Sequence, residues 1–131
     1  MVEKISVRTG KKEEFIDITA DVQKAIGRLK IKDGVLTIFT PHTTAAITIN
    51  ENADPSVVRD ILSGLRRIVS EIGYDHNEGN SPAHIKSSII GCSAQVIVED
   101  GRLVLGTWQG IYFCEFDGPR TRQVYIKLYG A

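Results

Sequence analysis

Residues 94–129, AQVIVEDGRLVLGTWQGIYFCEFDGPRTRQVYIKLY, decide the fold. Four segments of this stretch are rich in β-branched and aromatic residues and are predicted to be strands: 94–99, 102–106, 110–117 and 121–129. Asp-Gly at 100–101 and Gly-Pro at 118–119 separate strands and have the residue types that favour tight turns. Because consecutive strands joined by short turns form antiparallel hairpins, the stretch predicts a largely antiparallel sheet.

The chain before residue 92 adds four shorter predicted strands and two or three helices. The strands follow from apolar alternation or β-branched runs, and they cover residues 5–7, 15–18, 35–40 and 44–50. Helical spacing of apolar residues predicts a first helix capped by Thr19 and a long second helix over 55–72, capped by Asp54. Ser81, followed by proline, repeats the cap signal and predicts a short third helix. We therefore expect an α+β fold rather than a parallel α/β fold.

Composition indicates one domain over 1–131, because no linker, repeat or low-complexity tract divides the chain. Sixteen basic residues balance sixteen acidic ones, which argues against a nucleic-acid partner, since phosphate contacts need a basic excess. Residues 1–15 lack the apolar region of a signal peptide, and no apolar run reaches the roughly 18 residues of a membrane span. We expect a cytoplasmic protein with no membrane partner, in which Cys92 and Cys114 are reduced and buried.

The three histidines each lie at the boundary of a predicted element, where functional side chains usually gather. His42 follows a predicted strand, His76 lies in a polar loop, and His84 lies in the first turn of the third helix. Because three imidazoles and a water make a known zinc geometry, the pattern points to a site for a divalent metal, zinc or magnesium. The spacing matches no metal motif, however, and ordinary roles are the alternative, such as His76 pairing with Asp75.

The start of the third helix suggests a phosphate site. A helix N-terminus exposes unpaired N–H groups and favours an anion. Ser81, Lys86 and Ser87 would add donors beside His84. Without a glycine-rich loop, the plainer interpretation is that Ser81 caps the helix and that Lys86 and Ser87 face solvent.

Carboxylates form a third group of candidates. Glu51 ends a predicted strand, where it could orient a histidine or accept a proton. Glu115 and Asp117 share a strand face that begins apolar, so they need partners or a position at the edge of the sheet. Arg120 and Arg122 are close enough in the chain to be those partners, and we favour this structural interpretation.

Trp108 and Gln109 lie between two predicted strands. An aromatic ring and an amide at such a junction are typical of a pocket for a planar ligand. A core or interface position for Trp108 is an equally good interpretation.

Three motifs resemble the YjbQ-like family, whose members are also called secondary thiamine-phosphate synthases. In this chain they are PHTTAAITINE (41–51), YDHNEGNSPAHIKSSIIG (74–91) and LGTWQGIYFCEFDGPRTR (105–122). The resemblance covers nearly the whole chain, and three ordered motifs at matching distances are more specific than any one alone. It implies sandwich-like antiparallel sheets, assembly as a homotrimer, and one polar pocket shared by His42, His76 and His84.

The resemblance also implies an activity, a weak thiamine-phosphate synthase reaction that joins a pyrimidine diphosphate to a thiazole phosphate and releases pyrophosphate. Its residues in this chain would be the catalytic candidates His42, His76, His84, Glu51 and Arg120, and the ligand-binding candidates Ser81, Lys86, Ser87, Trp108 and Gln109. The histidines would hold the metal or move protons. The alternative is a non-catalytic trimeric module that binds a metal or a small phosphorylated ligand.

Overall fold

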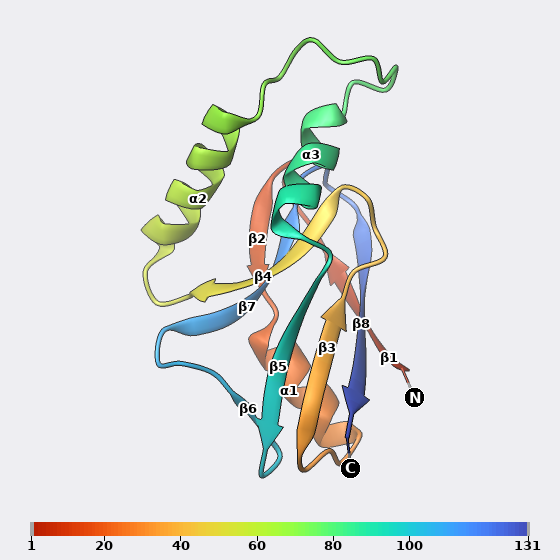
Figure 1. Ribbon diagram of the computed structural model, residues 1–131, viewed down its shortest axis with the longest axis vertical. Coiled ribbons are helices and arrows are strands. Elements are labelled where there is room, and N and C mark those ends of the chain that lie inside the picture. The colour runs from red at the N-terminus through yellow and green to blue at the C-terminus, as the bar shows by residue number, and fades with distance from the viewer. Residues whose placement is uncertain (1, 131) are drawn as a thin grey trace.

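A computed structural model describes residues 2–130 (Figure 1). These residues form eight strands and three helices, in the order β1 (Val2–Arg8), β2 (Glu14–Asp17), α1 (Thr19–Arg28), β3 (Gly34–Phe39), β4 (Ala45–Glu51), α2 (Pro55–Ile68), α3 (Ser81–Ile90), β5 (Ser93–Glu99), β6 (Arg102–Val104), β7 (Gln109–Glu115) and β8 (Thr121–Tyr129). The predicted α+β class and the single domain are confirmed. No helix within 2–130 is long and apolar enough to cross a membrane.

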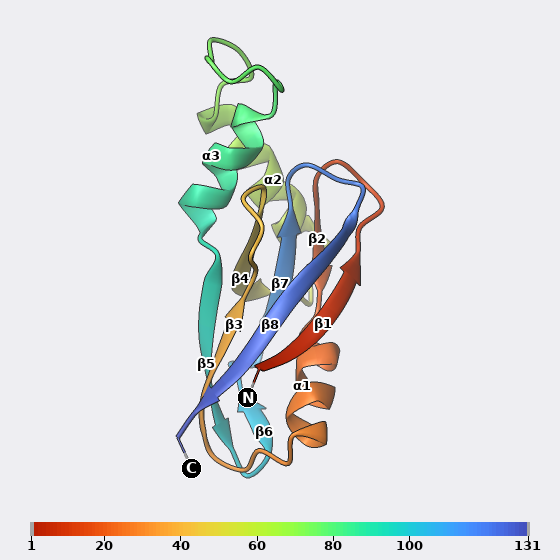
Figure 2. The same cartoon turned by 90° about the vertical axis from the view of Figure 1, so that its right-hand side faces the viewer.

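The strands form two antiparallel sheets, whose arrangement is clearest in Figure 2. The five-stranded sheet has the order β1-β8-β3-β5-β6, and the three-stranded sheet has the order β2-β7-β4. Only the predicted hairpin around 100–101 forms, between β5 and β6. The turn at 118–119 instead leads from the three-stranded sheet into the five-stranded one, so the prediction of consecutive hairpins in one sheet was wrong there.

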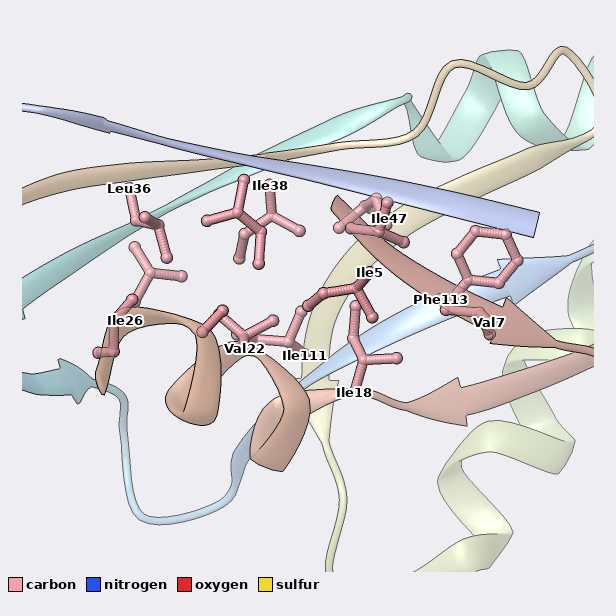
Figure 3. Packing of buried hydrophobic residues seen from close by; sticks show 14 of the residues in the cluster. Ile5, Val7, Ile18, Val22, Ile26, Leu36, Ile38, Ile47, Ile111 and Phe113 are labelled. Carbon is pink, nitrogen blue, oxygen red and sulfur yellow. The ribbon is translucent and has the colours of Figure 1, made fainter. Parts of the chain in front are cut away.

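The main apolar core lies between the two sheets and is closed at one end by α1 (Figure 3). Alternation on β3 buries Leu36 and Ile38, while Ile111 and Phe113 of β7 face them from the other sheet. Val22 is among the α1 residues that join the cluster. Each fully buried aliphatic or aromatic side chain of this kind stabilises the fold by about 1.5–3 kcal/mol.

A second apolar cluster lies on the opposite face of the three-stranded sheet, under α2 and α3. Its buried members are Ala46, Leu65, Ala83, Tyr112, Cys114 and Phe116. Strand β7 therefore contributes to both clusters, and its residues from 110 to 115 are all buried. This explains why residues 110–114 are continuously apolar instead of alternating, since both faces of the strand are covered.

Two helix boundaries differ from the sequence prediction. Ile18, not Thr19, is the N-cap of α1, and the Thr19 hydroxyl instead accepts the Ile111 N–H at 2.8 Å, which ties the helix start to β7. Helix α2 ends at Ile68, because Val69 turns to extended geometry and is buried. Val69 and Ile72 both fit the apolar spacing of a helix, although Val69 is buried and Ile72 is 82% exposed. The sequence therefore predicted the end of α2 at residue 72, four residues too late.

Of the other two cap predictions, one is confirmed and one is wrong. Asp54 caps α2 as predicted, since its carboxylate accepts the Ser56 N–H at 2.9 Å. Ser81 is the first residue of α3 rather than its cap, and Asn80 occupies the N-cap position. Cys114 is buried as expected, whereas Cys92 is exposed because it follows α3 at the surface.

One end of the molecule collects the chain segments that carry the three histidines, Arg120 and Arg122 (Figure 1). Strands β3 and β7 end there, β4 and β8 begin there, and α3 starts beside them. The segment 69–80 crosses the same end between α2 and α3. Antiparallel pairing thus brings loops that are far apart in sequence to one edge, where side chains are free of the core.

Candidate functional site

A pocket of about 450 Å³ lies at this end, and we call it the histidine pocket. Its lining residues are Pro41, His42, Thr43, Thr44, His76, Glu78, Asn80, His84, Asp117, Arg120 and Arg122. The β3–β4 loop, the segment before α3, the first turn of α3 and the β7–β8 loop all contribute. The three histidines of the chain thus line one pocket although they are far apart in sequence.

His42 is held in one orientation by the protein backbone. Its Nε2 accepts the Gln123 N–H at 2.9 Å, so this nitrogen carries no proton and the neutral ring has its N–H at Nδ1. Burial and the positive charges of Arg122 and Arg120 lower the pKa of His42 below its ordinary value, although the charge of Glu115 opposes them. His42 is therefore a neutral donor through Nδ1 at neutral pH.

His76 and His84 lie against each other on the outer side of the pocket. Their ring centroids are 5.4 Å apart and the rings are nearly perpendicular. His76 Nε2 also lies 3.9 Å from a carboxylate oxygen of Glu78, a neighbour other than the predicted Asp75. The segment 69–80 thus carries one histidine onto another that the first turn of α3 holds.

Arg122 forms the floor of the pocket through a fully buried ion pair with Glu115 (Arg122 Nε to Glu115 Oε2, 2.8 Å). Arg122 also donates to the Thr44 hydroxyl at 2.9 Å, and Glu115 accepts from the Thr9 hydroxyl and the Asp117 N–H. Burial by itself would raise the pKa of Glu115, but these hydrogen bonds and the Arg122 charge lower it below its ordinary value. Both groups are charged and satisfied, so they stabilise the loops around the pocket.

Arg120 is the more accessible of the two guanidinium groups, with 52% of its side chain exposed. It donates to the Asp117 carboxylate at 2.8 Å and to the Asp117 backbone carbonyl at 2.8 Å. The same Asp117 carboxylate accepts from the Asn80 amide at 3.0 Å. The pairing of Glu115 and Asp117 with the two arginines, expected from the sequence, is confirmed.

The predicted phosphate ligands on α3 do not converge on this pocket. Lys86 is buried, and its ammonium contacts Glu13 at 2.5 Å in a neighbouring cavity. Ser87 donates to the Thr43 carbonyl at 2.6 Å, and Ser81 does not line the pocket. Of the predicted set around the helix start, only His84 lines the histidine pocket.

Glu51, Trp108 and Gln109 lie at the other end of the three-stranded sheet. Glu51 pairs with Gln109 in the β4–β7 ladder, whereas Ala45 pairs with Glu115 beside the pocket. Six residues of strand separate the two positions, which is roughly 20 Å at about 3.3 Å per residue. Trp108 is 62% exposed, and Gln109 accepts the Gly106 N–H at 2.8 Å. A single chain therefore does not bring these three residues to the histidines.

As they stand, the side chains do not form a ready metal site. Between residues 2 and 130, no three His, Cys, Asp or Glu side chains are arranged to hold a metal ion. A metal needs an imidazole lone pair, and the only lone pair of the neutral His42 ring is on Nε2, which already accepts the Gln123 N–H. The divalent metal therefore stays a prediction, and no chemical step below depends on it.

Thr44 and Asn80 line the pocket but were not singled out from the sequence. Both directly flank an element that carries the site, since Thr44 precedes β4 and Asn80 precedes α3. A polar residue at such a boundary is the signal that could have found them.

The sequence is similar to known proteins along nearly its whole length. A sequence model of the family described as UPF0047 protein YjbQ-like matches residues 3–131. UPF0047 protein MJ1081 of Methanocaldococcus jannaschii is 53% identical over 131 residues, covering 99% of this chain and 95% of that protein. UPF0047 protein YugU of Bacillus subtilis is 53% identical over 135 residues, covering 99% of this chain and 100% of that protein.

Solved structures share the fold. A crystal structure of a YjbQ/UPF0047 family protein from Clostridium acetobutylicum superposes with a TM-score of 0.94 at 55% identity, covering 97% of this chain and 99% of that one. A YbjQ-like protein from Sulfolobus solfataricus gives a TM-score of 0.94 at 33% identity, covering 100% of this chain and 97% of that one. Because sequence and fold agree over essentially the full length, the chain belongs to the UPF0047 family of YjbQ-like proteins.

Proposed function

We propose that this protein is an enzyme that acts on a small phosphorylated substrate in the histidine pocket. The observation that carries the proposal is His42, which is held neutral with its N–H at Nδ1 in the pocket that also contains Arg120 and His84. A neutral imidazole N–H beside a guanidinium suits hydrogen bonding to a bound anion.

The hydrogen-bond donors of the lining favour an anion. Two guanidinium groups and three imidazoles line the pocket with two carboxylates, Glu78 and Asp117, so the charges of the arginines and carboxylates balance and the attraction comes from accessible donors. Asp117 is already paired with Arg120, and that arginine is half exposed, so its remaining N–H groups are accessible to an incoming phosphate. A phosphate in the pocket would also lie near the N-terminus of α3, where the helix dipole favours negative charge.

For the reaction, we propose the thiamine-phosphate synthase chemistry that the sequence resemblance implies. When a pyrimidine diphosphate is joined to a thiazole phosphate, the thiazole nitrogen forms a bond to the carbon that carries the diphosphate, the C–O bond of that carbon breaks, and its electron pair leaves with pyrophosphate. Arg120 and the Nδ1–H of His42 are donors that stabilise such developing charge. The thiazole nitrogen carries no proton to lose, so His76 and His84 would act only as donors of a proton to the departing pyrophosphate.

The test is pyrophosphate release from the two substrates by the purified protein and by His42→Gln, His84→Ala and Arg120→Ala variants. Loss of the proton donor His84, or of a donor that stabilises the leaving group, should lower the rate by roughly 10²- to 10⁴-fold. Asn77 is an exposed residue of the segment 69–80 that does not line the pocket, so Asn77→Ala should leave the rate of pyrophosphate release unchanged. Full activity in all three variants would end the proposal. Saturable binding of the substrates without product would favour the non-catalytic module instead.

We also propose that the protein works as a cytoplasmic homotrimer. Tyr129, Val35, Ile97 and Val104 lie in register across β8, β3, β5 and β6, and all four are exposed. This row is on the face of the five-stranded sheet that points away from the core, where subunit contact would cover it. Assembly would also offer a way for Trp108 of one subunit to approach the pocket of another.

A further inference from the structure

A groove of about 500 Å³ adjoins the histidine pocket, and we call it the neutral groove. Its lining residues are His42, Thr43, Ala45, His84, Ser87, Ser88, Gly91 and Cys92. His42, Thr43 and His84 also line the histidine pocket, so these three residues are common to the two spaces. A ligand that contacts both imidazoles can therefore extend into the groove.

The neutral groove differs from the histidine pocket in its charge. Among the described residues that line it there is no lysine, arginine, aspartate or glutamate, whereas two arginines and two carboxylates line the histidine pocket. An ionised group in the groove would lose part of its hydration and find no opposite charge in return. The part of a ligand that enters the groove should therefore be uncharged.

The side chains that belong to the groove alone have little hydrogen-bonding capacity left. The Ser87 hydroxyl donates to the Thr43 carbonyl at 2.6 Å, and the Ser88 hydroxyl donates to the His84 carbonyl at 2.9 Å. Both hydroxyl protons are therefore already used within the protein. Ala45 has only a methyl group as its side chain.

The backbone of the turn after α3, which forms the end of the groove, is also engaged. Gly91 donates its N–H to the Ser87 carbonyl at 2.8 Å, and its own carbonyl accepts the Ile47 N–H at 3.0 Å. The Cys92 carbonyl accepts the Thr40 N–H at 2.9 Å. The Cys92 thiol behaves as a small, weakly polar group. A ligand that needs many hydrogen bonds would therefore find few partners here.

We infer that the substrate is a phosphate ester with an uncharged, largely apolar organic part, which lies in the neutral groove while its phosphate is bound in the histidine pocket. The inference rests on the proposed function, because it takes the phosphate to be bound by Arg120 beside His42 and His84. An organic part with several hydroxyl groups would give up hydrogen bonds to water without replacing them, which costs free energy. A ring or a short alkyl chain needs no such partners and gains from burial of its apolar surface.

The inference is tested by calorimetric titration of the whole protein with methyl phosphate, phenyl phosphate and glycerol 3-phosphate. These probes share the phosphate group and differ only in the organic part. Phenyl phosphate should bind about tenfold more tightly than methyl phosphate, as expected when a substantial part of the ring surface is buried. Glycerol 3-phosphate should bind no more tightly than methyl phosphate, because the groove has few partners for its hydroxyl groups.

Cys92 provides a way to fill the groove chemically. Its side chain is exposed, whereas Cys114, the second cysteine of the chain, is fully buried, and this burial raises the pKa of the Cys114 thiol. Iodoacetamide should therefore modify Cys92 alone. The added group should remove the preference for phenyl phosphate, while methyl phosphate still binds. In Cys92→Ser, treatment with iodoacetamide should change the affinity for none of the probes.

Two neighbouring residues of α3 give a second test that needs no reagent. Ser88 is exposed and lines the groove, so Ser88→Trp should fill it and remove the preference for phenyl phosphate. Ile89 is 53% exposed and does not line the groove, so Ile89→Trp should keep the preference. The two variants add the same side chain to the same helix and differ only in where it lies.

Phenyl phosphate that binds the wild type no more tightly than methyl phosphate, or less tightly than glycerol 3-phosphate, would overturn the inference. A preference that survives both alkylation of Cys92 and Ser88→Trp would overturn it too. So would a Cys92 that resists iodoacetamide in the native protein, since another chain would then cover the groove. If no probe binds, or if Arg120→Ala binds methyl phosphate as well as the wild type does, the proposed function itself has failed, and the inference fails with it.

Discussion

His42 Nε2 accepts a hydrogen bond from the backbone N–H of Gln123, so a side chain of the β3–β4 loop is tied to the third residue of β8. The donor is a main-chain group and cannot be removed by mutation of the Gln123 side chain. The position of the imidazole in the histidine pocket is therefore determined by the five-stranded sheet itself. Only His42 substitutions change this contact without altering the sheet.

The first prediction concerns pH. Burial and the charges of Arg122 and Arg120 lower the folded-state pKa of His42, so the unfolded chain binds this proton more readily. The contribution of His42 to stability is therefore complete above the ordinary histidine pKa of about 6.5 and is lost as pH falls through the lower folded value. Urea unfolding between pH 8 and pH 5 should show a smaller loss of stability for His42→Gln than for the wild type. If the free energy of unfolding changed equally with pH in the wild type and in His42→Gln, the lowered pKa of His42 would be contradicted.

The second prediction compares a buried arginine–glutamate ion pair with an exposed one. Arg122→Met leaves Glu115 buried and uncompensated, and should lower the free energy of unfolding by about 3–5 kcal/mol. Arg28→Met breaks the pair with Glu3, in which the arginine side chain is 56% exposed, and should cost less than about 1 kcal/mol. Chemical denaturation measures both values. Similar costs for the two variants would mean that burial of the Arg122 pair has no energetic consequence.

The third prediction concerns the turn that carries Asp117 and Arg120. A Cβ at Gly118 would collide with the Lys11 carbonyl and lie 2.8 Å from the Thr9 hydroxyl, so Gly118→Ala should destabilise the protein by about 1–3 kcal/mol. Gly64→Ala, in α2, meets nothing within 4 Å and should stabilise the helix by up to about 1 kcal/mol. Thermal unfolding of the two variants should shift in opposite directions. A Gly118→Ala protein as stable as the wild type would show that the turn can move.

The fourth prediction concerns the divalent metal that the sequence suggested. Because His42 Nε2 is occupied by Gln123, we expect the purified, untagged protein to hold much less than one zinc or magnesium ion per chain by mass spectrometry. One ion per chain, lost in both His42→Ala and His84→Ala, would instead establish a three-histidine site. It would also require His42 to leave its backbone contact.

The fifth prediction concerns assembly. Light scattering should give the mass of three chains for the wild type. Ile97→Asp places a charge in the exposed apolar row and should yield single chains with unchanged circular dichroism. Ile89→Asp, on the exposed side of α3, is the matched control and should remain trimeric. A wild type with the mass of one chain would exclude the proposed assembly.

Much of the fold was predictable, because it depends on local patterns. Alternation gave β3 its inward Leu36 and Ile38, and the Asp-Pro pair at 54–55 marked the start of α2. The pairing of Glu115 with Arg122 also followed from the sequence, since a charge within an apolar strand needs a nearby partner.

The missed parts depend on contacts between distant residues. Lys86 was predicted to lie beside a phosphate or in solvent, but its partner Glu13 is 73 positions away and draws it into another cavity. The acceptor role of His42 depends on a backbone N–H, which no residue type reveals. Likewise, the assignment of β7 and β8 to different sheets depends on burial of both faces of β7, and turn chemistry does not encode it.

The position of β7 has a consequence for how the molecule comes apart. The strand supplies Phe113 to one apolar cluster and Cys114 to the other, so neither cluster can lose its packing while the other keeps it. Denaturation should therefore be a single cooperative event with no half-folded species. Backbone amides of β7 should exchange with deuterated water only through global opening, while those of 71–79 exchange far faster through local opening.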